Sequence, residues 1–66
     1  MKPKFPDIEV DLSGEDGNAF SIMGRVTKAM RQAGVSADDI KAYTDDATSG
    51  DYDHLLSVSM QTVTCD

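Results

Sequence analysis

The segment between Asn18 and Gly34 has the clearest periodic pattern in the chain, and this pattern constrains the fold more than any other feature. Its apolar residues recur every three or four positions, which is typical of one side of an α-helix. They are Ala19, Phe20, Ile22, Met23, Val26, Ala29, Met30 and Ala33. Asn18 can cap the first turn with its side-chain oxygen, and Gly34 can adopt the left-handed conformation that ends many helices. The sequence therefore predicts an amphipathic helix between these two residues.

The residues before this helix predict a strand. Apolar and polar residues alternate there, which indicates a strand with one buried face. The apolar residues are Ile8, Val10 and Leu12. Residues 1–6 include two prolines and two lysines and predict a flexible N-terminal arm. The expected division is therefore an arm over residues 1–6 and a single α+β domain over residues 7–66.

A second helix is expected directly after Gly34. Ser36 and Asp39 have the spacing of a capping box, and acidic residues in a first turn suit the helix dipole. Its apolar side would consist of Ala37, Ile40, Tyr43, Thr44 and Ala47. The run Thr48-Ser49-Gly50 is expected to end this helix.

The last segment supports two interpretations. A third helix could start at Asp51 or Asp53, whereas an alternating pattern favours a strand. The alternating residues are Leu56, Val58, Met60 and Thr62. We favour a short helix from about Tyr52 to about Met60, followed by a strand to Cys65. The predicted fold is an α+β mini-domain, β-α-α-α-β, with two strands and two to three helices.

The size of the chain indicates self-association. A domain of 66 residues has a thin core, because chains of this length bury only about 60% of the surface that they expose when unfolded. The one cysteine, Cys65, cannot form an internal disulfide, and the sequence has no Cys/His cluster with metal-ligand spacing. Two strands alone also make a weak sheet. We therefore expect a homodimer or a higher homo-oligomer, formed through strand edges or helix faces.

Charge and hydropathy limit the partners. The net charge of −6 argues against direct binding to a nucleic-acid backbone, which needs a broad cationic surface. A basic protein, or a small anion in a local cationic pocket, remains compatible with it. No apolar run approaches the roughly 20 residues that span a bilayer, and the N-terminus lacks the apolar segment of a secretory signal. A cytoplasmic protein without a membrane partner is therefore expected.

The first predicted helix contains three of the six basic residues, spaced three positions apart: Arg25, Lys28 and Arg31. Such a group suits a phosphate, because Arg binds phosphate oxygens in a bidentate fork and Lys adds a mobile charge. A symmetric dimer would bring two copies of the group together, and aromatic residues would stack on a base. The predicted ligand-binding residues are Asn18, Phe20, Arg25, Lys28, Arg31 and Tyr52. The alternative is a solvated helix face whose cations pair with nearby carboxylates.

Catalysis, metal binding and a cofactor are not expected. His54, the only histidine, adjoins Asp53, and neighbours in sequence rarely form the oriented pair of a catalytic triad. Cys65 lies far from His54 in sequence and has no glycine-shaped nucleophile turn. The glycine-containing turn over residues 14–18 lacks a phosphate-loop pattern, so we interpret it as turn and cap chemistry.

Three motifs together resemble a family of short proteins encoded by bacteriophages and prophages. They are Asp16-Gly17-Asn18-Ala19-Phe20, the Ala33-Gly34 helix end, and Thr48-Ser49-Gly50-Asp51-Tyr52-Asp53. The resemblance covers nearly all of the chain after Pro6. It implies an anti-defence protein in the cytoplasm of the bacterial host. Such proteins include oligomeric sponges that sequester nucleotide immune signals and acidic proteins that occlude a host enzyme.

The expected function follows from the basic group and the resemblance taken together. It is sequestration of a phosphorylated small molecule of the cyclic-nucleotide type. The alternative is an acidic inhibitor or regulator of a host protein, acting as a nucleic-acid mimic. Its negative face would be formed by Asp38, Asp39, Asp45, Asp46, Asp51 and Asp53.

Overall fold

The structure, a computed structural model, describes residues 2–11 and 18–65. Its elements are strand β1 (Phe5–Val10), helices α1 (Ala19–Gln32), α2 (Ala37–Ala47) and α3 (Tyr52–Thr62), and strand β2 (Val63–Cys65). This order confirms the predicted β-α-α-α-β fold, and it shows that the last segment is a helix followed by a strand. The predicted burial of Leu12 and the predicted turn over residues 14–17 lie outside the described residues.

Helix α1 begins and ends at the predicted caps. Asn18 Oδ1 accepts a hydrogen bond from the backbone N–H two residues later, at 2.8 Å. At the other end Gly34 has a φ of 84°. The N–H groups of Gly34 and Val35 donate to the carbonyls of Arg31 and Met30, at 3.1 and 3.0 Å. This pair of bonds is a Schellman motif, whose left-handed residue favours glycine.

The buried side of α1 is narrower than the predicted apolar stripe. Ile22, Val26 and Met30 are buried, whereas Phe20 is 78% exposed. Phe20 was wrongly included because it lies about 120° around the helix from the centre of the buried side, at 3.6 residues per turn. Ala33 is also exposed, since it is the C-cap beyond the last helical turn.

Helices α2 and α3 also begin at capping side chains. Ser36 Oγ accepts from the N–H of Asp39 at 3.2 Å, and the Asp51 carboxylate accepts from the N–H of His54 at 2.9 Å. Helix α3 continues to Thr62, beyond the predicted end near Met60. Met60, near that predicted end, is 56% exposed. It lies about 140° around the helix from the buried Leu55.

The strands β1 and β2 form a two-stranded parallel sheet, with Phe5 opposite Val63 and Val10 opposite Cys65. Parallel strands need a long crossover connection, and the three helices supply it. Ile8 and Val10 are buried, as the alternating pattern predicted. The sheet therefore joins the two ends of the chain.

The strand begins earlier in the sequence than predicted. The N–H of Lys4 donates to the carbonyl of Gln61 at 2.8 Å, and Thr64 Oγ1 donates to the carbonyl of Pro6 at 2.8 Å. Pro6 lacks an N–H, but its carbonyl is still available to the neighbouring strand. Phe5 and Pro6 therefore belong to β1 and not to the N-terminal arm that was predicted over residues 1–6.

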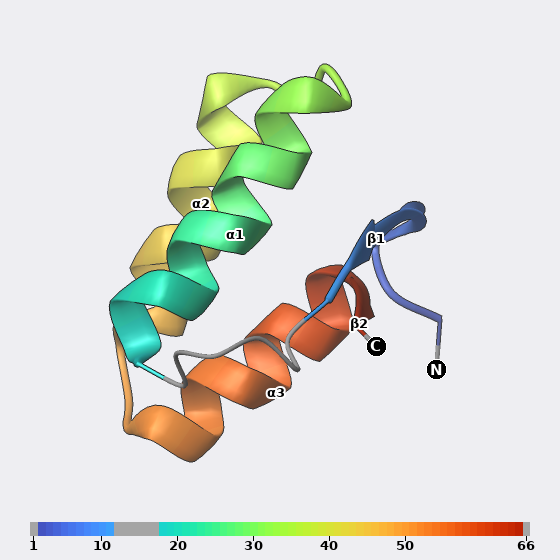
Figure 1. Cartoon of the computed structure of the whole chain (residues 1–66). Helices are drawn as coiled ribbons and strands as arrows, with labels where there is room; N and C mark the ends of the chain where they lie inside the picture. Colours follow the sequence, from blue (N-terminus) through green and yellow to red (C-terminus); the bar gives the residue numbers. More distant parts are fainter. Residues whose placement is uncertain (1, 12–17, 66) are drawn as a thin grey trace.

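The core lies between the helices and one face of the sheet. In Figure 1, α1 and α2 run side by side in opposite directions, α3 crosses below them, and the strands lie beyond the end of α3. None of the helices in the described residues is long and apolar enough to span a membrane. The buried apolar residues are Ile8, Val10, Ile22, Val26, Met30, Ile40, Tyr43, Ala47, Leu55, Val58 and Val63.

A buried hydrogen bond joins α2 to α3. Tyr43 Oη lies 2.6 Å from Ser59 Oγ, and Ser59 Oγ donates to the carbonyl of Leu55 at 2.9 Å. Because the one hydroxyl hydrogen of Ser59 is used in this way, Tyr43 is the donor of the pair. Burial raises the pKa of the Tyr43 hydroxyl; the bond to Ser59 lowers it, and the charge of Cys65 raises it. The expected homo-oligomer remains a prediction.

Candidate functional site

The three basic residues predicted to act together lie on different sides of α1. Residues spaced three apart move about 60° around a helix at each step, so Arg25 and Arg31 lie about 120° apart. Arg25 and Lys28 line a shallow hollow of about 290 Å³ beside β1, whereas Arg31 lines a larger groove between α1 and α2. The fold thus separates Arg31 from the other two.

The hollow beside β1 suits an anion poorly. Arg25 Nη1 donates to the backbone carbonyl of Asp11 at 3.0 Å, so part of its guanidinium is already used. Glu9 and Asp11 line the same hollow as Arg25 and Lys28. Their carboxylates offset the positive charge. This side of α1 therefore matches the alternative of a solvated face beside carboxylates.

The remaining predicted ligand residues do not line the groove that contains Arg31. Asn18 uses its side-chain oxygen as the cap of α1. Phe20 and Tyr52 are 78% and 44% exposed, at the first turns of α1 and α3. The groove is lined by Met23, Gly24, Thr27, Arg31, Val35, Ala37, Ile40, Lys41, Thr44, Asp45 and Thr48.

This groove between α1 and α2 has a volume of about 650 Å³. Met23, Val35 and Ile40 give it an apolar floor, because Ile40 is buried and the other two are half-buried. Gly24 widens it from the α1 side, where a Cβ would meet nothing within 4 Å. Its size lies within the roughly 300–1,000 Å³ of small-molecule sites.

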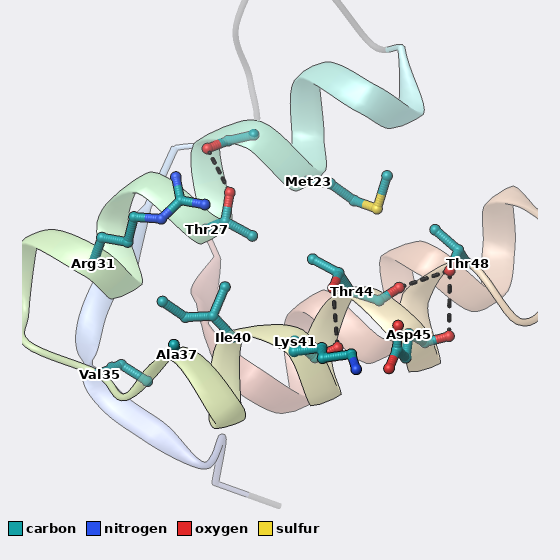
Figure 2. Close-up of a pocket in the computed structure, with 11 residues that line it drawn as sticks. Met23, Thr27, Arg31, Val35, Ala37, Ile40, Lys41, Thr44, Asp45 and Thr48 are labelled. Carbon is teal, nitrogen blue, oxygen red and sulfur yellow. Dashed lines mark hydrogen bonds between the residues drawn. The ribbon is translucent and has the colours of Figure 1, made fainter.

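The polar residues of the groove are ordered along its length. The helices run antiparallel, so Arg31 lies at the same end as Val35 and Ala37, while Met23 lies near Thr48 at the other end (Figure 2). Lys41 lies between the two ends on α2. Positive charge therefore occupies one end and the middle of the groove, and the carboxylate of Asp45 lies toward the other end.

Three threonine hydroxyls line the groove as acceptors. Thr27 Oγ1 donates to the carbonyl of Gly24 at 3.2 Å and Thr44 Oγ1 to the carbonyl of Lys41 at 2.9 Å. Thr48 Oγ1 likewise donates to the carbonyl of Thr44 at 2.7 Å. A hydroxyl has one hydrogen and two lone pairs, so each oxygen keeps lone pairs for a ligand donor.

The groove was not predicted from the sequence. The sequence pattern gave Lys41, Asp45 and Thr27 no role in binding a nucleotide. One signal was present: Gly24 lies inside a helical pattern, where glycine is unfavourable by about 1 kcal/mol relative to alanine. The short connection over residues 33–36 also implied that two helix faces would meet.

A second polar cluster joins the end of α2 to α3. His54 Nε2 lies 3.2 Å from Ser49 Oγ, 3.0 Å from the carbonyl oxygen of Asp46 and 3.2 Å from Asp46 Oδ1. All three contacts use one ring nitrogen, whereas a catalytic triad uses Nε2 for the nucleophile and Nδ1 for the carboxylate. Ser49 Oγ itself donates to the Asp46 carbonyl at 2.6 Å. The cluster therefore connects the C-terminal end of α2 to the first turn of α3 and lacks the arrangement of a catalytic triad.

Metal-ligating residues are dispersed. Among residues 2–11 and 18–65, no three His, Cys, Asp or Glu side chains come together in a way that could hold a metal ion. Of the acidic residues on α2 and its exit, Asp39 pairs with Lys4 at 3.7 Å and Asp46 contacts His54.

The groove between α1 and α2 is the candidate functional site, because it combines a ligand-sized volume with cationic side chains. Comparisons with protein-family models, with curated proteins and with solved structures found no match.

Proposed function

We propose that this protein binds and sequesters a phosphorylated small molecule of the cyclic-nucleotide type in the groove between α1 and α2. One observation carries the proposal: in an acidic chain, Arg31 and Lys41 line a groove with an apolar floor and a ligand-sized volume of about 650 Å³. An acidic protein attracts an anion only where local cations outweigh its overall field. The proposal therefore places the ligand at Arg31 and Lys41, and not along the series Arg25, Lys28 and Arg31.

The phosphate is held at the cationic part of the groove. Arg31 and Lys41 are both exposed and come from facing helices, so they can approach one anion from two sides. A guanidinium donates two parallel hydrogen bonds to phosphate oxygens, and an ammonium adds a mobile charge. Neither the guanidinium nor the ammonium needs a metal ion or a covalent bond to hold a phosphate in this way.

The apolar floor would hold the ring system of the ligand. Met23, Val35 and Ile40 offer flexible and branched apolar surface without a polar group. A thioether packs favourably against an aromatic ring and adapts to its outline. Because Phe20 and Tyr52 do not line the groove, stacking on an aromatic side chain has no part in this version of the site.

The resemblance to phage proteins supplies the biological setting. A sponge for an immune signal of the bacterial host needs tight binding, which the cations and the apolar floor of the groove would supply. A second copy of the chain would close its open side, which would raise affinity by excluding water from the charged groups. The homo-oligomer is a part of the proposal that gel filtration with light scattering can test.

Variants on the two facing helices test the site. In titration calorimetry with cyclic mononucleotides, Arg31→Gln and Lys41→Gln should each weaken binding by about tenfold or more, since a hydrogen bond to a charged group contributes about 1.5–3 kcal/mol. The matched controls are Arg25→Gln and Lys28→Gln, which remove the same charge from α1 outside the groove. Equal losses in all four variants would indicate a general charge effect and would sink the groove as the site.

A second candidate function rests on the exposed carboxylates. Asp38, Asp45 and Asp53 are exposed, and they belong to α2 and the first turn of α3. An acidic inhibitor of a basic host protein would use such a face. Asp39, Asp46 and Asp51 already have structural contacts, which leaves this face smaller than the sequence predicted. Asp38→Lys and Asp53→Lys together should abolish capture of a basic partner while leaving nucleotide binding unchanged.

A further inference from the structure

The end of the groove away from Arg31 presents hydrogen-bond acceptors. Thr44, Asp45 and Thr48 lie there within one turn of each other on α2 and its C-cap (Figure 2). We propose that this acceptor end, with Asp45 as the specificity-determining residue, binds the donor edge of a guanine base. The inference rests on the proposed function, because it names the class of nucleotide that the same groove would take.

The hydrogens of the two hydroxyls are already used. Thr44 Oγ1 donates to the carbonyl of Lys41 at 2.9 Å, and Thr48 Oγ1 donates to the carbonyl of Thr44 at 2.7 Å. An ionised carboxylate is also an acceptor only, with two oxygens and about four lone-pair positions. A ligand group that enters this end therefore meets lone pairs from all three side chains, and it must bring the hydrogens itself.

Guanine carries two adjacent donors on its pairing edge, the N1–H and the 2-amino group. Two parallel N–H groups match the two oxygens of a carboxylate, as they do in a bidentate Arg–carboxylate pair. Adenine offers one amino group beside an unprotonated ring nitrogen, which would face another acceptor. Hypoxanthine keeps the N1–H but lacks the amino group. The acceptor end therefore favours guanine over both.

Asp45 also fixes the direction in which the ligand lies. It follows Lys41 by four residues, which places it one turn further along α2 and away from Arg31. Its negative charge repels a phosphate from the acceptor end, so the phosphate is confined to Lys41 and Arg31. The distance from Lys41 to Thr48 is about 10 Å along the helix axis, at 1.5 Å per residue, which suits the length of a nucleotide.

Three ligands that differ only in the base test this inference. Titration calorimetry of the 66-residue chain would use cyclic GMP, cyclic IMP and cyclic AMP. Cyclic GMP should bind about tenfold more tightly than the other two, because it alone forms both bonds to the charged carboxylate. Asp45→Asn should remove this preference, since its amide replaces one acceptor with a donor. The matched control Asp38→Asn removes the same charge from α2 outside the groove and should keep the preference.

The outcomes separate this inference from the proposed function. If all three nucleotides bind equally and Arg31→Gln weakens each of them, the guanine inference is wrong and the proposed function stands. If Asp45→Asn and Asp38→Asn change the preference equally, Asp45 is not the specificity-determining residue. If none of the three binds to protein that circular dichroism shows to be folded, the proposed function and the guanine inference both fail.

Discussion

Helix α2 faces α3 on one side and α1 on the other, and the two contacts treat polar groups in opposite ways. Toward α3 it buries Tyr43 and Ala47, and the Tyr43 hydroxyl bonds to Ser59 in the interior. Toward α1 it exposes Lys41 and Asp45 along an open groove. A side with satisfied polar groups stabilises the fold, whereas a side with exposed charges leaves them available to a ligand. The two sides of this short helix therefore differ: the side toward α3 is packed, and the side toward α1 is open.

The largest loss of stability is expected from a substitution in the hydrophobic core. Met30 is fully buried, so Met30→Ala should destabilise the chain by about 2–5 kcal/mol through lost burial and the cavity that it leaves. Met23→Ala, on the half-buried floor of the groove, should cost clearly less. Urea denaturation followed by circular dichroism measures both. Similar losses would show that the groove floor is as much a part of the core as Met30 is.

The contact between α2 and α3 depends on one hydrogen-bond acceptor, Ser59 Oγ. Ser59→Ala leaves the Tyr43 hydroxyl buried without its partner, which should cost about 1–3 kcal/mol. Tyr43→Phe should cost less, because Ser59 Oγ still donates to the carbonyl of Leu55. Denaturation midpoints of the two variants give the order. The reverse order would mean that Tyr43 finds another acceptor or a water when Ser59 is lost.

The local elements of the fold could be predicted because each one carries its own signal. Asn18, Ser36 and Asp51 cap their helices through side chains that the sequence displays directly. The error at Phe20 has a physical cause. Phe20 is an apolar residue on the solvent side of α1, and hydrophobicity alone does not tell an exposed apolar residue from a buried one.

The groove could not be predicted because its residues come from two helices. The spacing of Arg25, Lys28 and Arg31 was read as proximity, but each step turns the side chain away from the previous one. Lys41 had no partner in the sequence pattern, since its neighbour across the groove is set by how α1 and α2 pair. The parallel pairing of β1 with β2 was missed for the same reason: it depends on the path of the whole chain.

Alkaline pH offers a way to sharpen the comparison without a change in packing. Burial raises the pKa of Tyr43 above its usual value of 10.0. The unfolded chain therefore loses this proton at a lower pH than the folded chain does. The contribution of Tyr43 to stability is fully present below about pH 10 and declines as the pH rises through its raised pKa. The alkaline decline in melting temperature should be smaller in Tyr43→Phe, and an unchanged decline would assign it to other groups.

The smallest effect is expected where two glycines are exchanged for alanine. A Cβ at Gly24 would enter open space in the groove, so Gly24→Ala should stabilise α1 by about 1 kcal/mol, the helix-propensity difference. The same change at Gly50 would place a Cβ 2.8 Å from His54 Cγ and 2.9 Å from His54 Cβ, so it should destabilise the chain. Melting temperatures that move in opposite directions would confirm that Gly24 borders empty space and that Gly50 borders the His54 side chain.

A larger residue at Gly24 extends the same test from stability to binding. Gly24→Leu should keep a melting temperature close to that of Gly24→Ala, because the side chain has room, yet it should fill the groove beside Met23 and displace a ligand. Loss of cyclic-nucleotide binding in the leucine variant but not in the alanine variant would locate the ligand between α1 and α2. Unchanged binding in both variants would show that the open side of α2 has no role in recognition. Arg31 and Lys41 would then be ordinary solvated charges.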